Sequence, residues 1–175
     1  MRQAGFSLLE LLIAVAVAAV LVSLAAPNFH RAVVKNQVVA TANALVADLQ
    51  TARTQAVSRG VSVGAIASGG DWRRGWQVQP DGDAATSGYQ AATATPIRQH
   101  EALADDAVLR AEQGGSALTQ VVFAADGSVV GATADVALRL CRPAGALAQA
   151  VRIEVSPVGQ IRSHRDADAT GASCP

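Results

Sequence analysis

The hydrophobic pattern divides the chain into an apolar segment, an amphipathic segment and a region of short β-rich runs. The apolar segment extends from Leu11 to Ala26 and is interrupted only by Ser23. Counted from Phe6, it has about 21 residues, and at about 1.5 Å per residue it matches a hydrocarbon core of about 30 Å. The sequence therefore predicts a transmembrane helix over residues 6–27.

The amphipathic segment follows Pro27. Apolar residues recur there every three or four positions, as on one face of a helix, and Thr41 is expected to fill the step between Val38 and Leu45. Residues 28–60 are therefore predicted to continue the helix and to pack on a domain. The stripe consists of Val34, Val38, Leu45, Leu49, Ala52 and Ala56.

Together the two segments predict one helix from Phe6 to Arg59, about 80 Å long at about 1.5 Å per residue. Gly60 is the expected C-cap, because glycine readily adopts the left-handed conformation that ends many helices. A proline inside a helix removes one backbone hydrogen bond, so a kink is expected near Pro27.

Beyond Gly60, β-rich runs alternate with turns that contain Gly, Pro and Asp, which favours antiparallel hairpins. We expect an α+β fold in which the long helix packs on an antiparallel β-sheet domain spanning residues 61–175. Residues 84–96, rich in Ala and Thr, are expected to form a mobile surface loop. The candidate strands are residues 61–67, 75–79, 107–112, 118–123, 136–141, 150–155 and 160–163.

Composition narrows the function. Only 3% of the 175 residues are aromatic, so the core must be built from Val, Leu, Ile and Ala. The formal net charge is zero, so nucleic-acid binding would need a local basic patch. No constellation of a nucleophile, a base and an acid is recognisable, and we expect neither catalytic residues nor a metal or other cofactor.

The start of the chain resembles the signal of type IV prepilins and type II secretion pseudopilins. It consists of a short leader, MRQAG, followed by FSLLE and the apolar run. The resemblance implies a leader over residues 1–5, cleavage after Gly5 by prepilin peptidase and N-methylation of Phe6. It also implies a single-pass protein of the bacterial inner membrane, with its domain in the periplasm, that assembles with other pilins or pseudopilins.

Later residues resemble the GspH/FimT family, which comprises minor pseudopilins of type II secretion and the FimT/FimU minor pilins. The resemblance is carried by the stretch from Leu45 to Gly60, by Trp72, and by the pair Gly75-Trp76. It implies a subunit of a type IV pilus or a type II secretion pseudopilus. Within the family, the paired cysteines of the C-terminal region make the chain similar to the FimT/FimU branch.

Glu10 stands near the start of the predicted membrane helix. An ionised carboxylate inside a bilayer costs about 2.5 to 3.5 kcal/mol on insertion scales, so it requires compensation. After cleavage, the α-amino group of Phe6 on a neighbouring subunit would supply the partner, and Glu10 would then set the register between subunits. The alternative is a carboxylate that reaches the membrane surface and has no such role.

Two features of the N-terminus oppose this interpretation. A secretory signal peptide also combines a basic start with an apolar run, and residues 23–25 could form its cleavage site. In addition, Arg2 is the only side-chain cation before the run, whereas Arg31 and Lys35 follow it, so the positive-inside rule favours the opposite orientation. We follow the resemblance to prepilins over both of these features and expect the domain on the periplasmic side of the membrane.

The chain has two cysteines, Cys141 and Cys174. On the periplasmic side of the membrane disulfides form readily, so we expect these two to be bonded. The bond would close a loop of about 33 residues and stabilise the domain by about 3 to 4 kcal/mol in the chain-entropy model. Two free thiols are the alternative, and a zinc site would need more ligands than this region offers.

The C-terminal region is locally basic. Between Arg139 and Arg165 it has five arginines and only one acid, Glu154. The planar guanidinium suits phosphate oxygens, so a patch of several arginines would bind nucleic acid in a salt-dependent way. The five are Arg139, Arg142, Arg152, Arg162 and Arg165.

The resemblance adds a possible role in DNA uptake. FimT-type proteins linked to natural transformation carry a Gly-Arg-x-Arg motif, and the stretch from Gly159 to Arg162 matches half of it, with Gln160 in place of the first arginine. Arg152, Arg162 and Arg165 are therefore candidate DNA contacts, although two aspartates after Arg165 would weaken their field. An ordinary solvated strand face is the alternative.

Overall fold

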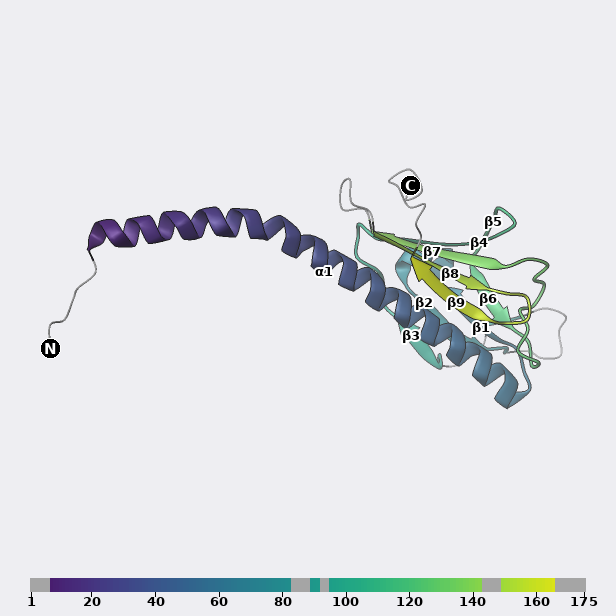
Figure 1. The fold of residues 1–175 in the computed structure, drawn as a ribbon. Coiled ribbons are helices and arrows are strands. Elements are labelled where there is room, and N and C mark those ends of the chain that lie inside the picture. The colour runs from purple at the N-terminus through teal and green to yellow at the C-terminus, as the bar shows by residue number, and fades with distance from the viewer. Residues whose placement is uncertain (1–6, 83–88, 92–94, 143–148, 166–175) are drawn as a thin grey trace.

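The computed structural model describes residues 7–82, 89–91, 95–142 and 149–165. Its dominant feature is α1 (Leu8–Arg59), a helix of 52 residues that continues without interruption through Pro27. Figure 1 shows that the helix axis bends before α1 reaches the sheets. The predicted C-cap is confirmed, because Gly60 has a φ of 67° and its N–H donates to the Ala56 carbonyl at 2.9 Å.

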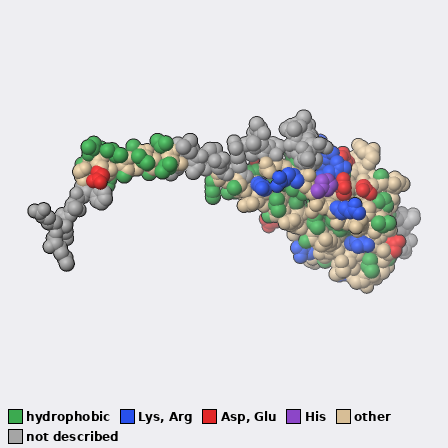
Figure 2. Space-filling model, viewed as in Figure 1, with side chains coloured by type: hydrophobic (Ala, Val, Ile, Leu, Met, Phe, Trp, Pro, Cys, Tyr) green, Lys and Arg blue, Asp and Glu red, His purple; other side chains and the backbone are tan. Residues whose placement is uncertain are grey.

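The first half of α1 projects away from the rest of the protein (Figure 1). Every side chain from Leu8 to Leu21 is exposed, and nearly all of them are apolar. We call residues 8–21 the uncovered half. Figure 2 shows hydrophobic side chains along the visible face of this half. In the part of the chain that the structure describes, no helix is long and apolar enough to cross a membrane.

The second half of α1 packs on two antiparallel sheets. The first has the strand order β3-β2-β1-β6 and the second has the order β5-β4-β7-β8-β9. The strands of the first sheet are β1 (Val63–Ala67), β2 (Trp76–Pro80), β3 (Arg98–His100) and β6 (Gln120–Phe123). Those of the second are β4 (Val108–Gln113), β5 (Ser116–Leu118), β7 (Val136–Arg142), β8 (Gln149–Val155) and β9 (Ile161–Arg165).

Helix and sheets share one hydrophobic core, and the predicted α+β fold is confirmed. The predicted helix stripe is buried throughout, from Val34 to Ala56. One position was wrong: Ala42, four residues after Val38, fills the step between Val38 and Leu45, while Thr41 is only partly buried. The largest fully buried side chains include Trp76, Phe123, Leu45, Leu49, Leu138 and Ile153.

The seven predicted runs all contain strands, but one of them serves both sheets. Residues 116–118 pair with β4, and residues 120–123 pair with β1. Between them, the carbonyl of Thr119 accepts a hydrogen bond from the Ala67 N–H at 2.8 Å. The chain therefore passes from one sheet to the other at Thr119, which the pattern of apolar residues alone did not predict.

The expected loop over residues 84–96 is only partly described, and its aromatic residue is half-buried. Tyr89 donates a hydrogen bond to the Gln79 carbonyl at 2.8 Å. Its ring covers Gly64 so closely that a Cβ there would lie 2.8 Å from a ring carbon. Burial raises the pKa of Tyr89 to about 12, and the nearby charge of Asp81 adds to the shift. Tyr89 therefore belongs to the packed domain.

Candidate functional site

The helix start places Glu10 in the first turn of α1. Ser7 is the N-cap, and its Oγ accepts a hydrogen bond from the Glu10 N–H at 3.2 Å. A serine at the N-cap followed three residues later by a glutamate is typical of a helix start, and the negative charge is favourable there because helix N-termini are electropositive. This local role of Ser7 and Glu10 was missed from the sequence. Gly5 and Phe6, the predicted processing residues, lie outside the described residues.

A buried charge network joins α1 to the first sheet. Asp48 is only 3% exposed. The indole N–H of Trp76 donates to its Oδ2 at 2.8 Å, and Nε of Arg98 donates to its Oδ1 at 2.6 Å. Two donors compensate the buried carboxylate, which would otherwise be strongly unfavourable. The network explains how the three residues of β3 hold their place, and nothing in the sequence pattern marked Asp48 as buried.

His100 lies against the ring of Trp76. The two rings are stacked, with centroids 3.9 Å apart and an angle of 13° between their planes. Nδ1 of His100 lies 2.8 Å from the Glu101 carbonyl, and because a carbonyl only accepts, Nδ1 must be the donor. A neutral His100 ring therefore offers Nε2 as an acceptor.

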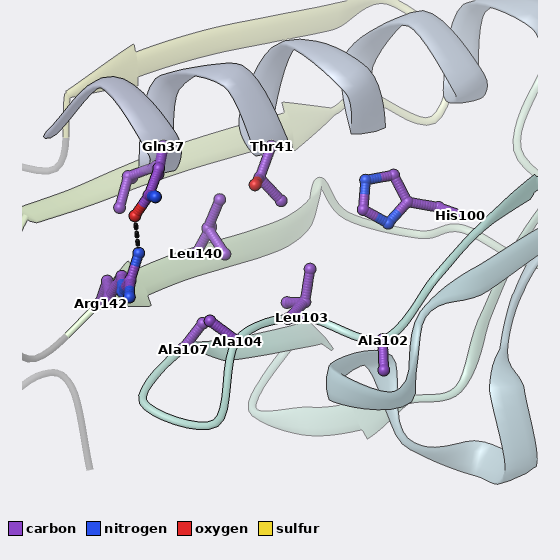
Figure 3. A pocket seen from close by; sticks show the side chains of 10 residues that line it. Gln37, Thr41, His100, Ala102, Leu103, Ala104, Ala107, Leu140 and Arg142 are labelled. Carbon is purple, nitrogen blue, oxygen red and sulfur yellow. Dashed lines mark hydrogen bonds between the residues drawn. The ribbon is translucent and has the colours of Figure 1, made fainter. Parts of the chain in front are cut away.

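A hollow of about 250 Å³ opens beside these residues, between α1 and the segment that joins β3 to β4 (Figure 3). We call it the α1 socket. Val38, Leu103 and Leu140 give it an apolar lining. The side chains of Thr41 and His100 point toward the space (Figure 3). The remaining lining residues are Gln37, Ala102, Ala104, Ala107 and Arg142.

The three predicted DNA contacts do not lie on one face. Neighbouring residues of a strand point to opposite faces, so Arg162 and Arg165 on β9 point apart. Arg152 lies on the same face as Arg162, but its Nε donates to Glu154 at 2.8 Å. Gln160, which replaces the first arginine of the motif, accepts a hydrogen bond from Arg162 at 2.6 Å. Figure 2 shows basic and histidine side chains together on the visible face of the domain.

Strand register adds Arg110 and His164, which the sequence analysis did not group with the five arginines of the C-terminal region. Arg110 on β4 lies opposite Arg139, Arg139 lies opposite Arg152, and Arg152 lies opposite His164. The four form a row across the outer face of the second sheet. Glu112 approaches Arg139 to 4.0 Å, so acids partly neutralise the row, as Glu154 does beside Arg152.

The glycine of the half-matching motif has a structural explanation. Gly159 has a φ of 79°, and a Cβ there would collide with the carbonyl of Gly127. Arg53 on α1 donates to that same carbonyl at 3.0 Å. The turn between β8 and β9 is therefore packed against the C-terminal part of α1, and Gly159 is required by close packing.

Cys141 is buried on β7 and is not a free thiol. Cys174 lies outside the described residues, so the pairing of the two stays a prediction. Within the residues that the structure describes, no group of three or more His, Cys, Asp or Glu side chains could hold a metal ion.

The long bare helix attached to an α+β domain defines a pilin-like fold, and solved structures share it. Two crystal structures of the type IV minor pilin FimU from Pseudomonas aeruginosa match with TM-scores of 0.53 and 0.57. Both are 22% identical over 71% and 74% of this chain and 90% of the FimU chain. The minor pseudopilin EpsH of the Vibrio cholerae type 2 secretion system matches with a TM-score of 0.54 and 16% identity, over 75% of this chain and 98% of EpsH.

Family models agree with this class. The model for the type II transport protein GspH matches residues 41–159, and the model for the prokaryotic N-terminal methylation motif matches residues 1–26. The chain belongs to the GspH family, and the resemblance drawn from the sequence is confirmed. No curated protein is similar enough in sequence to match the chain.

Proposed function

We propose that this protein is a minor pilin or pseudopilin subunit that enters a type IV pilus or a type II secretion pseudopilus through α1. The observation that carries the proposal is the contrast between a domain with a complete core and an uncovered half with apolar side chains on all sides. Such a helix is unfavourable in water and requires lipid or other helices around it. Filament assembly supplies neighbouring helices.

The uncovered half serves first as the anchor in the inner membrane, with the domain in the periplasm. Prepilin peptidase cleaves after Gly5, and the new terminus at Phe6 is N-methylated. Support comes from the methylation motif over residues 1–26. Intact-mass analysis of membrane-extracted protein tests this step: the expected mass is that of a chain that begins at methylated Phe6. A retained leader in cells with active peptidase, or cleavage near Ala26, would reject it.

Within the filament, Glu10 pairs with the α-amino group of Phe6 on a neighbouring subunit. A carboxylate without a partner among apolar helices is unfavourable. The register between subunits that pairs this carboxylate with an amine is therefore favoured over registers that leave it unpaired. Support comes from the place of Glu10 in the first turn of α1, one turn from Phe6 in sequence.

Filament co-purification at matched membrane levels tests the role of Glu10. Glu10→Gln keeps the size of the side chain and removes its charge, so insertion should persist while incorporation falls severalfold. Ser7→Ala is the matched control, because it weakens the same helix start and keeps the carboxylate. Incorporation of Glu10→Gln at the wild-type level would remove the registration role.

DNA binding is a second candidate function, favoured by the exposed basic side chains of β9. β9 is an edge strand of the second sheet, and its exposed basic side chains are Arg162, His164 and Arg165. Because the cations lie on two faces and acids neutralise Arg139 and Arg152, we expect weak, non-specific binding, in the micromolar range or above at physiological salt by analogy with other non-specific binders.

A salt series with duplex DNA tests this candidate. The logarithm of the affinity should fall with the logarithm of the salt concentration by about 0.9 per phosphate contact, and Arg162→Gln with Arg165→Gln should reduce that slope by about two. Arg73→Gln is the matched control, since Arg73 is exposed and paired with Asp71 on a distant turn. Absence of binding at low salt would leave assembly as the function.

A further inference from the structure

The α1 socket has the volume of a single bulky side chain. Its volume of about 250 Å³ is below the range of about 300 to 1,000 Å³ that is typical of small-molecule sites. Val38 and Leu140 in its lining are buried, and Leu103 packs against the core. The few side chains that dominate the binding free energy of protein interfaces lie in well-packed pockets, and the aromatic residues Trp and Tyr are enriched among them, as is Arg.

The socket is held in shape before any partner arrives. His100 is fixed by its stacking on Trp76 and by its hydrogen bond to the Glu101 carbonyl. At the other end, Gln37 accepts a hydrogen bond from Arg142, which also pairs with Asp106 at 2.7 Å. A pocket whose walls are already ordered loses little conformational entropy on binding.

The position of the socket on α1 indicates what kind of molecule lies next to it. Its helix residues, Gln37 to Thr41, follow the uncovered half on the same helix. If the uncovered half packs against a neighbouring helix, that helix continues alongside α1 toward the socket. Phe29 shows that such a helix carries suitable side chains: it is 73% exposed, and among the described residues no other Phe, Tyr or Trp side chain is exposed.

We propose that the α1 socket receives an aromatic side chain from the N-terminal helix of an adjoining pilin subunit, in the way that Phe29 projects from α1 of this chain. The inference rests on the proposed function, because only assembly brings two such helices together. Phe29 lies nine residues before Val38, which is about 14 Å along the helix axis. The aromatic side chain and the socket thus lie at different positions along the axis of α1. A contact that joins two different surfaces of neighbouring subunits is head-to-tail, and contacts of this type repeat along an open filament.

Photo-crosslinking of the full chain in cells that assemble the filament tests the proposal. Ala104, an exposed residue of the rim, is replaced by p-benzoylphenylalanine, and the cross-linked peptides from purified filaments are identified by mass spectrometry. The expected product joins position 104 to the N-terminal helix of a pilin subunit, within one turn of an aromatic residue. A product with a pilin globular domain, with a protein of another class or with lipid alone would overturn the proposal, as would no product.

A blocking variant gives a second measurement. Ala102→Trp places a large side chain at the mouth of the socket and should reduce the cross-linking yield about tenfold, the loss expected for blocking an interface hot spot. Ala125→Trp is the matched control, because Ala125 is also exposed but lies on the turn beside Gly127 at the opposite end of the packed helix. An equal yield from both variants would overturn the proposal.

The same cross-linker at Leu12 separates the socket from the function on which it rests. Leu12 lies in the uncovered half and should cross-link to helices of other pilin subunits. Cross-links from Leu12 without cross-links from Ala104 would reject the socket and retain filament assembly. Loss of both would reject assembly as well.

Discussion

The two halves of α1 belong to one helix, but they differ in their apolar content and in their surroundings. From Leu8 to Leu21 every side chain is exposed, whereas from Val34 to Ala56 one stripe is buried against two sheets. The first half has apolar residues on all faces, and the second has them on one. An apolar surface on all faces suits the first half to contact with helices or lipid on every side, whereas a single apolar face suits the second half to contact with one domain.

The acids on the two halves follow the same division. Glu10 is exposed in the first turn of α1, where the electropositive helix terminus stabilises its charge. Asp48 is buried and satisfied by Trp76 and Arg98 from the first sheet. The charge on the packed half thus has its partners within the chain, and for the charge on the uncovered half we propose a partner on a neighbouring subunit.

The largest expected effect comes from truncating one leucine on each half. Leu49→Ala should lower the free energy of unfolding by about 3 kcal/mol, because it leaves a cavity in the core. Leu12→Ala, at a side chain that is 56% exposed, should change it by less than about 0.5 kcal/mol. Urea unfolding of the detergent-solubilised chain, followed by tryptophan fluorescence, measures both. Equal losses would contradict the contrast between the halves.

A smaller effect is expected from neutralising each acid. Asp48→Asn keeps an acceptor for the Trp76 indole and removes the charge that holds Arg98, so the domain should lose about 1.5 kcal/mol. Glu10→Gln should leave the unfolding of the domain unchanged. If Asp48→Asn has no effect in the same urea assay, the ion pair with Arg98 does not hold β3 to the helix.

The N-cap Ser7 and the C-cap Gly60 give a further test of the difference between the two halves of α1. Gly60→Ala forces a left-handed conformation on alanine and should cost about 1 kcal/mol of domain stability. Ser7→Ala should cost about the same locally, without changing the unfolding of the domain. Hydrogen exchange reports the local loss as about fivefold faster exchange in the first turn of α1. A fall in domain stability in Ser7→Ala would show that the halves unfold together.

The smallest effect at neutral pH concerns Tyr89 and tests how far the packed domain extends. Because burial raises the pKa of Tyr89 to about 12, the folded state favours the protonated phenol. Its contribution to stability is present below the ordinary pKa of about 10 and is lost as the pH rises toward 12. Tyr89 is the only tyrosine, so absorbance at 295 nm follows it alone. Ionisation of the native protein near pH 10 would place Tyr89 in solvent.

Much of the fold was predictable because it depends on local order in the sequence. The helix stripe and the Gly60 cap follow from a spacing of three or four residues and from one glycine. The split of residues 118–123 between two sheets was missed, because both parts are apolar and only their pairing partners differ. β3 was missed because three residues give no periodicity, and its place depends on Arg98 reaching Asp48.

Some features of the candidate sites were also predictable from the sequence, and others were not. By itself, the sequence determined the family, the uncovered helix and the acid at position 10, since these are properties of neighbouring residues along the chain. Only the tertiary structure decided that Arg162 and Arg165 point apart, that Arg110 joins a row ending at His164, and that His100 forms a wall of the α1 socket. Those relations depend on strand register and on contacts between distant segments, and no local pattern of residues encodes them.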